Sequence, residues 1–266
     1  MNETQHIFLS PHYDDAALSC GGLIAQLSAA GEQAVVATVF GGKPNDDQLS
    51  PFARTIHGRP LADADLVEQR RAEERHALAL LGAESRPGDF LDCIYRQDAT
   101  QTRWLYANEA ALFGPVDPAD DALVEELAHC LAALAPLPGQ CVLYAPLAIG
   151  NHVDHQIAQR SAAILEHHAY DVRYFEDYPY SARNPAGLES RLVHLAERSR
   201  WQSFVVPLRP ADLRGKVDAV LAYPSQLGVL FPGDGPAQAR VAAALETHAL
   251  HTGNGRLAER WWQLRP

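Results

Sequence analysis

The chain has 266 residues, of which 47% are hydrophobic, so it can bury the core of one large α/β domain, and we expect a single domain over residues 1–266. Its formal net charge of −11 at pH 7 argues against a protein that binds nucleic acid through the phosphate backbone. We expect a cytoplasmic protein without a membrane span, because no apolar run is long enough to cross a bilayer, residues 1–5 do not begin a signal peptide, and the four cysteines contain no C-x-x-C pair.

Apolar patterning predicts strands that alternate with helices along the chain. Runs of apolar and β-branched residues mark the strands, and apolar residues three and four positions apart mark the helices. In chain order, the predicted elements are a strand at 6–9, a helix at 16–30, a strand at 34–40, a helix at 63–81, a short strand at 90–93, a helix at 119–134, a strand at 141–145, a helix from about 150 to 168, strands at 172–176 and 204–208, and helices at 213–222 and 237–250.

The predicted strands are too short to show a polar face, which is typical of a sheet that is buried on both sides. Because they alternate with helices, we expect a three-layer, Rossmann-like α/β fold with a mostly parallel sheet and helices on both faces. Residues 41–59 and 94–118 have no regular pattern, and we interpret them as long loops, the first of the kind that often forms a lid. We also expect Glu176-Asp177 in a surface loop and Trp261-Trp262 in core or interface packing.

The first cluster of chemically active residues is Ser10–Asp15 (S-P-H-Y-D-D), between the first predicted strand and the first predicted helix. Ligands of α/β sheets bind outside the carboxyl ends of the strands, so such a junction suits a site. One imidazole, His12, and two adjacent carboxylates, Asp14 and Asp15, suit a divalent metal such as zinc, with one carboxylate left to handle protons. Taken alone, the two aspartates would be ordinary helix caps.

A second cluster, Gly150–His155 (G-N-H-V-D-H), also follows a buried strand and begins a helix. Taken alone, its histidines would be a solvated helix start, since the chain has twelve histidines. The two junctions together favour a metal held by His12, Asp15 and His155. Two imidazoles and one carboxylate leave coordination positions open, as in a catalytic rather than a structural zinc site.

The residues left over in each cluster suit proton transfer. Asp14 neighbours a predicted ligand and can accept a proton from metal-bound water, and His152 can stabilise charge on a substrate oxygen or protonate a leaving group. Two other interpretations stay open. Two histidines and one carboxylate also form the facial triad of non-haem Fe(II) oxygenases, although those commonly have all-β folds. The second alternative interpretation is a non-catalytic protein that keeps a sugar or metal pocket. The presence of Asp14 and His152 argues against it.

The two clusters resemble the motifs A-H-P-D-D-E and H-P-D-H of the PIG-L/LmbE-like zinc-dependent N-deacetylases, which are N-acetylglucosaminyl deacetylase-like. The resemblance implies an LmbE-like fold. It implies three zinc ligands, His12, Asp15 and His155. It also implies roles for three further residues: Asp14 as general base, His152 as the group that polarises or protonates, and Asp154 as the support of His152.

Weaker matches extend the resemblance over most of the chain. Arg70–Glu73 resembles the family's R-x-x-E helix, Lys216–Gln226 its K-x-x-A…S-Q segment, and Glu259–Trp262 its aromatic ending. By this resemblance Arg70 is a candidate substrate contact, with a solvent-facing ion pair on a helix as the alternative.

The resemblance implies hydrolysis of an N-acyl group, such as N-acetyl, on an amino sugar or sugar conjugate. The expected partner is therefore a small molecule of this class, and the expected cofactor is Zn²⁺, with Fe²⁺ as the alternative because it uses similar ligands. The chain departs from the usual motifs at Tyr13, Ala16 and Val153. None of these positions is a predicted ligand, but the missing acidic residue at Ala16 alters the support around the site.

Overall fold

A computed structural model describes residues 4–44, 49–57, 63–196 and 200–265. Its centre is a seven-stranded sheet in which the strands from β3 to β5 pair in parallel, whereas β7 is antiparallel to both of its neighbours. Across the sheet the order is β3 (Glu84–Pro87), β2 (Gln33–Thr38), β1 (Gln5–Ser10), β4 (Cys141–Pro146), β5 (Asp171–Phe175), β7 (Ala258–Leu264) and β6 (Trp201–Pro207).

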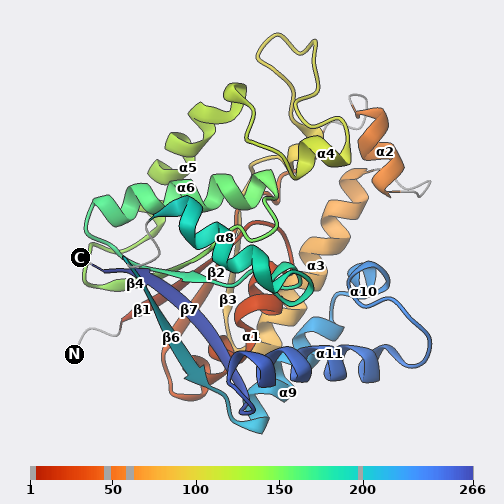
Figure 1. Ribbon diagram of the computed structural model, residues 1–266. Helices are drawn as coiled ribbons and strands as arrows, with labels where there is room; N and C mark the ends of the chain where they lie inside the picture. Colours follow the sequence, from red (N-terminus) through yellow and green to blue (C-terminus); the bar gives the residue numbers. More distant parts are fainter. Residues whose placement is uncertain (1–3, 45–48, 58–62, 197–199, 266) are drawn as a thin grey trace.

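Helices cover both faces of the sheet, which confirms the predicted three-layer α/β fold (Figure 1). One face is covered by α1 (Asp15–Ala29), α3 (Asp63–Leu81) and α9 (Pro210–Leu221), with α11 (Ala237–Thr252) packed against α9 and β7. The other face is covered by α5 (Asp121–Leu134), α6 (Val153–His167) and α8 (Pro185–Leu195). Shorter helical segments among the described residues are α2 (Pro51–His57), η1 (Cys93–Tyr95), α4 (Glu109–Leu112), η2 (Pro118–Asp120), α7 (Tyr180–Arg183) and α10 (Pro224–Leu230).

Two hydrophobic cores lie on opposite sides of the sheet, because successive side chains of a strand point to opposite faces. In β1, Ile7 and Leu9 belong to the core under α5 and α6, whereas Phe8 belongs to the core under α1 and α3. Every residue of β4 is buried. This burial on both faces explains why the central strands are apolar throughout instead of alternating.

The centre of the sheet is a topological switch point. From β1 the chain continues to β2 and β3 on one side, and from β4 it continues to β5 on the other. Because β1 and β4 pair in parallel, their carboxyl ends meet at the same edge of the sheet. The first cluster follows β1 and the second follows β4, so both open at the place where α/β sheets bind ligands.

The predicted strand at residues 90–93 is wrong. The edge strand β3 comes earlier, at Glu84–Pro87, where the mostly exposed side chains gave no apolar signal and the pairing with β2 is made by the backbone. Residues 93–95 instead form η1, and Asp92 caps this turn by accepting a hydrogen bond from the N–H of Ile94 at 3.2 Å.

The two stretches predicted as long loops contain further structure. α2 lies within residues 41–59, of which 45–48 and 58–59 fall outside the described residues, and α4 lies within residues 94–118. Side chains from both stretches form a small hydrophobic cluster of their own that includes Ala53, Ile94 and Leu112. The segments are therefore packed against each other rather than extended into solvent.

The sequence patterns also missed β7, α8 and α10. The tryptophans that we expected in core or interface packing lie in β7, where Trp262 is buried and Trp261 stacks on Phe204 of β6 with 4.0 Å between ring centroids. Among the described residues, no helix is both long enough and apolar enough to cross a membrane.

Candidate active site

The turn from β1 into α1 carries the first cluster. Asp14 occupies the N-cap position of α1, yet its side chain accepts no hydrogen bond from the helix. The hydroxyl of Ser10 takes that place by accepting a hydrogen bond from the N–H of Ala16 at 3.0 Å. The carboxylate of Asp14 is therefore not used for capping, unlike that of an ordinary N-cap aspartate.

The backbone of Asp14 is held in an unusual conformation, with a φ of 106° in the left-handed region that favours glycine. Two residues one turn apart on α3 bind the peptide group that precedes it. Arg70 donates to the carbonyl of that group at 2.8 Å, and Glu74 accepts a hydrogen bond from its N–H at 3.2 Å. Glu74 is 1% exposed and also accepts hydrogen bonds from the hydroxyls of Thr38 and Tyr223. We call this pair, Arg70 and Glu74, the α3 clamp.

The second cluster lies at the start of α6. His152 is the N-cap residue, and its Nδ1 accepts a hydrogen bond from the N–H of Asp154 at 3.3 Å. In the neutral imidazole the proton then lies on Nε2, which is free to donate. His155 follows in the first turn, and its Nδ1 donates to Asp177, directly beyond β5, at 2.6 Å. That bond leaves Nε2 of His155 as the available ligand atom.

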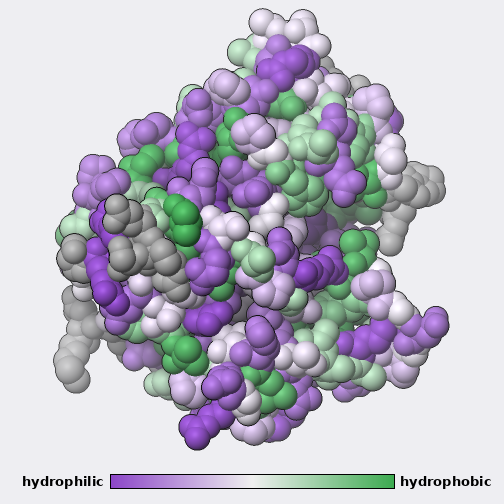
Figure 2. Space-filling model, in the orientation of Figure 1, coloured by the Kyte–Doolittle hydropathy of each residue, from purple (hydrophilic) through white to green (hydrophobic). Residues whose placement is uncertain are grey.

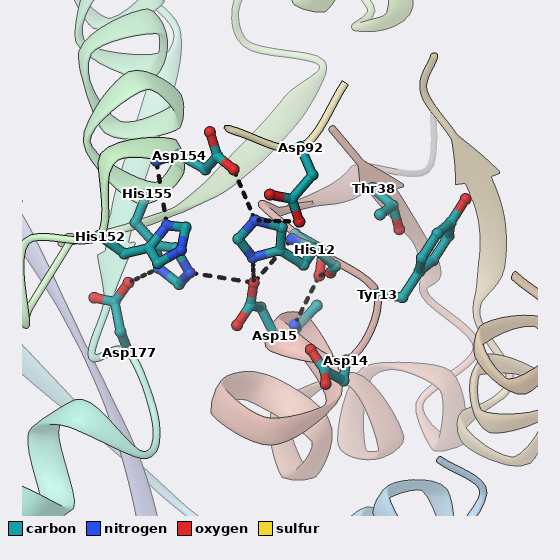
Figure 3. A network of polar contacts seen from close by, with 12 residues as sticks. His12, Tyr13, Asp14, Asp15, Thr38, Asp92, His152, Asp154, His155 and Asp177 are labelled. Atoms are coloured by element: carbon teal, nitrogen blue, oxygen red, sulfur yellow. Dashed lines mark hydrogen bonds and ion pairs between the residues drawn. The ribbon is translucent and has the colours of Figure 1, made fainter. Parts of the chain in front are cut away.

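Figure 3 shows the side chains of His12, Asp15 and His155 pointing toward one another from the two junctions. Oδ2 of Asp15 lies 3.3 Å from Nδ1 of His12 and 3.3 Å from Nε2 of His155. Two ligand atoms bound to one tetrahedral zinc ion lie about 3.4 Å apart, so these three side chains fit a common ion. Ring nitrogens of His12, His152 and His155 also lie within 4.8 Å of one another, so His152 borders the same position.

The carboxylate of Asp154 contacts the ring nitrogen of His12 that does not face Asp15. Its Oδ2 lies 2.9 Å from Nε2 of His12 and accepts a hydrogen bond from the N–H of Cys93 at 3.0 Å, and its Oδ1 forms an ion pair with Arg96 at 2.7 Å. The family resemblance implied that Asp154 supports His152. The hydrogen bond between those two residues uses the backbone of Asp154 alone, so we reassign its carboxylate to orienting His12.

The surroundings of the first cluster give its two carboxylates different pKa values. Burial raises the pKa of Asp14 to about 7, with Asp15 adding to the rise and Arg70, 3.6 Å away, opposing it. Burial acts in the same direction on Asp15, but His155 and His12 outweigh it and hold the pKa of Asp15 well below its usual value. Asp15 is therefore the permanently ionised one of the two candidate residues, and Asp14 has a pKa suited to exchanging a proton near neutral pH.

The three histidines of the site also differ in their pKa values. Burial alone would lower the pKa of His12 and of His155, but neighbouring aspartates outweigh it, raising the pKa of His12 well above its usual value and that of His155 to about 9. The acidic surroundings thus favour positive charge at this point, as a bound cation would supply. Burial and the nearby His12 lower the pKa of His152 well below its usual value, which keeps that ring neutral.

These side chains line a cavity of about 210 Å³. Its walls also include Arg70, Asp92, Tyr180 and Gln226. Arg70 thus lies where a substrate contact was predicted, although its observed bonds are to the backbone and side chain of the first cluster. Its contact with substrate stays a prediction.

Two residues of the site were not found from the sequence. Glu176 and Asp177 were expected in a surface loop, which is wrong, because both are buried and Asp177 is bonded to His155. Its position directly after a strand was the signal that could have found it. Glu74 was overlooked because the family's R-x-x-E pattern points to Glu73, which bonds to Ser225, whereas Glu74 binds the N–H of Asp14.

Comparison with known proteins identifies the family. Residues 7–165, which include both clusters and more than half of the chain, match the family PIG-L: GlcNAc-PI de-N-acetylase. The chain belongs to this family. It is therefore a metal-dependent deacetylase, and the oxygenase interpretation has no support.

Individual relatives agree with the family. A 2'-N-acetylparomamine deacetylase of Niallia circulans is 30% identical over 239 residues, which are 85% of this chain and 82% of that protein. The solved structure of a deacetylase–teicoplanin complex is 30% identical, covers 97% of each chain and has a TM-score of 0.77. The zinc-inhibited form of a teicoplanin deacetylase is 29% identical, with the same coverage and a TM-score of 0.76. The similarity thus extends over nearly the whole chain.

Proposed function

We propose that this deacetylase removes an N-acyl group, such as acetyl, from an amino sugar or sugar conjugate, with Zn²⁺ held by His12, Asp15 and His155. The observation that carries the proposal is the position of Oδ2 of Asp15, 3.3 Å from an inner nitrogen of each histidine. Asp14 and His152 lie beside this point, where a general base and a hydrogen-bond donor are needed.

A bound zinc ion lowers the pKa of its water and polarises the acyl carbonyl. Asp14, with its pKa near 7, accepts a proton from the attacking water. His152 donates a hydrogen bond from Nε2 to the amide oxygen as negative charge develops there. The protonated Asp14 then returns its proton to the amine nitrogen, and the C–N bond breaks to give a free amine and a carboxylate.

The donor set supports zinc as the ion. Two imidazoles and one carboxylate, each oriented by an outer hydrogen bond, are typical of catalytic zinc, although ferrous iron accepts the same ligands. One similar structure is a zinc-inhibited form, so zinc binds at least one close relative. Metal analysis of the purified protein separates zinc from iron.

The relatives support an amino-sugar substrate, because the Niallia circulans protein is named for deacetylation of N-acetylparomamine. A cavity of about 210 Å³ with charged and amide side chains on its walls suits a small polar group next to the reacting bond. A cytoplasmic location stays a prediction.

Incubation of the metal-loaded protein with a panel of N-acetylated amino sugars, scored for free amine and acetate, tests the proposed activity. We expect stoichiometric release of both products from at least one member of the panel. In Asp14→Asn, we expect metal content to persist while kcat falls by about 100-fold or more, because the carboxamide cannot accept a proton.

Release of neither product from any member would favour a non-catalytic sugar-binding protein. Full activity of Asp14→Asn would show instead that another group is the base.

A further inference from the structure

We propose that Lys216 and Glu259 are positioning residues of the active site, which fix α1 against the sheet so that the first cluster meets the second. This inference rests on the proposed function, because it concerns the same metal position. Lys216 lies on α9 and Glu259 on β7, both beyond residues 7–165, the part of the chain that matches the family. The sequence assigned neither residue a role in the site.

Lys216 and Glu259 form an ion pair inside the protein. Nζ of Lys216 lies 2.7 Å from Oε1 of Glu259, and the two residues are 3% and 8% exposed. Taking two charges out of water can cost more than their attraction returns, so a buried ion pair is weak evidence for stability. The contacts that this pair makes with α1 indicate a different role.

The ion pair binds the backbone of one turn of α1. The carboxylate of Glu259 accepts hydrogen bonds from the N–H groups of Gly22 and Leu23, at 3.0 and 2.8 Å. The ammonium group of Lys216 donates to the carbonyl of Ser19 at 3.4 Å. In an α-helix, the carbonyl of residue 19 and the N–H of residue 23 are the two partners of one hydrogen bond. The pair thus holds both partners, so α1 cannot slide or rotate there without breaking these contacts.

Two consecutive glycines in the middle of α1 allow this approach. A Cβ atom at Gly21 would lie 2.9 Å from Cγ of Lys216, which is too close for a real side chain. A Cβ atom at Gly22 would lie 3.0 Å from Oε1 of Glu259 and closer still to a methyl group of Leu208. Glycine lowers the stability of a helix interior. The close contact with the ion pair therefore explains why two glycines stand there.

The same turn of α1 connects the first cluster to the second. Ser19 lies one turn after Asp15, and its hydroxyl accepts a hydrogen bond from the N–H of Tyr178 at 3.1 Å. Tyr178 directly follows Asp177, whose carboxylate is bonded to His155. A shift of α1 would therefore change the distance from Oδ2 of Asp15 to Nε2 of His155, which is 3.3 Å. That distance decides whether both side chains can bind one ion.

Lys216 and Glu259 act through α1 and not on the substrate. The catalytic cavity lies between α4 and α10, whose Leu112 and Leu230 line it, and Figure 2 shows the surface hollowed there. The described residues that line this cavity include neither member of the ion pair. We therefore expect their replacement to lower zinc affinity and kcat and to change KM by less than about twofold.

Two variants separate positioning from stability. Lys216→Met keeps most of the side-chain length but leaves the carboxylate of Glu259 buried and unpaired, which is strongly destabilising. The double variant Lys216→Met/Glu259→Gln removes both charges, so we expect it to regain much of the lost resistance to urea. It does not regain the hydrogen bond to Ser19 or the second acceptor for the N–H groups of α1. We therefore expect its zinc affinity to stay about tenfold or more below that of wild type.

Chelator competition measures the zinc affinity, urea unfolding of the zinc-free protein measures stability, and steady-state kinetics give kcat and KM. The matched control is Arg173→Met, which removes an ion pair of 2.9 Å with Asp171 on β5, and we expect it to keep the zinc affinity of wild type. Wild-type zinc affinity in the double variant, or in Lys216→Met, would show that the pair only stabilises the fold and would overturn the proposal. Zinc binding by wild type without deacetylation would contradict the proposed activity alone, and absence of zinc binding in wild type would contradict both.

Discussion

Asp14 combines a strained backbone conformation with a side chain that we propose as the general base. A non-glycine residue with φ of 106° costs on the order of 1–3 kcal/mol and persists only where the surroundings enforce it. Here the α3 clamp binds both ends of the preceding peptide group, and Ser10 caps the helix in place of Asp14. The strain thus turns the carboxylate away from the helix and leaves it available as a base.

The clamp predicts that Glu74 positions Asp14. In Glu74→Met, the side chain keeps its bulk but accepts no hydrogen bond from the N–H of Asp14, so we expect kcat to fall at least tenfold with KM and metal content unchanged. Glu74→Gln keeps an acceptor oxygen, and we expect it to stay within about threefold of wild type. Steady-state kinetics and metal analysis of both variants make the comparison.

The matched control is Glu166→Met, which removes a hydrogen bond from the hydroxyl of Tyr174 to a glutamate outside the site. We expect its kcat to match wild type, which would show that loss of a glutamate–tyrosine hydrogen bond does not by itself lower kcat. An unchanged kcat in Glu74→Met would show that the clamp does not position the base. Loss of metal in that variant would show that it supports the ligands instead.

Asp177 gives a second prediction at the residue scale. Its carboxylate, 2.6 Å from Nδ1 of His155, fixes the ring so that Nε2 faces Asp15 and the candidate metal position. In Asp177→Asn we expect zinc affinity to fall by about 10- to 100-fold, as is common when such a partner of a ligand is replaced. Competition with a chelator of known affinity measures the change, and an unchanged affinity would contradict the role.

The candidate ligands could be located from the sequence, whereas most of the residues that support them could not. His12, Asp15 and His155 lie in short motifs at strand-to-helix junctions, and that local context is visible in the chain. The partners of these residues depend on which distant segments meet. The family resemblance implied that Asp154 supports His152, whereas the fold brings its carboxylate to His12.

At the scale of elements, prediction succeeded where burial leaves an apolar pattern. The central strands β1, β2 and β4 and the long helix α3 were placed to within a few residues. The edge strand β3 was missed because its residues are polar and exposed. β7 was missed because its sequence, A-E-R-W-W-Q-L, mixes charged and polar residues with the tryptophans and shows no apolar run.

The packing of α11 leads to a prediction about pH. Burial, together with the nearby positive charges of Lys216, His251 and Arg260, lowers the pKa of His248 to about 4. Between pH 6.5 and 4 the unfolded chain therefore binds a proton at this residue that the folded chain does not. Stability that is present above pH 6.5 is lost as the pH falls through this window.

We expect His248→Phe to lose less stability than wild type between pH 7 and pH 4.5, by about 1–3 kcal/mol. Urea unfolding at both pH values measures the difference, and His129→Phe, at an exposed position on α5, is the control. Parallel losses in wild type and His248→Phe would contradict the prediction.

At the scale of the whole molecule, the sheet topology creates the site. The chain leaves β1 and β4 in opposite directions across the sheet, so the two junctions open at one point although they are about 140 residues apart in sequence. Neither junction is sufficient alone, because each contributes one imidazole to the candidate metal ligands and one further group for proton transfer. The fold therefore brings two ordinary helix N-termini together, and the site forms only where they meet.

Metal content measured together with activity tests this convergence most directly. Wild type, His155→Ala and the control His76→Ala on α3 are stripped with a chelator and titrated with Zn²⁺, and bound metal and deacetylation of an N-acetylated amino sugar are followed in parallel. We expect one ion per chain and proportional activity in wild type and His76→Ala, and neither in His155→Ala. Full activity of the stripped wild type, or one tightly bound ion with full activity in His155→Ala, would contradict a metal centre built from His12, Asp15 and His155.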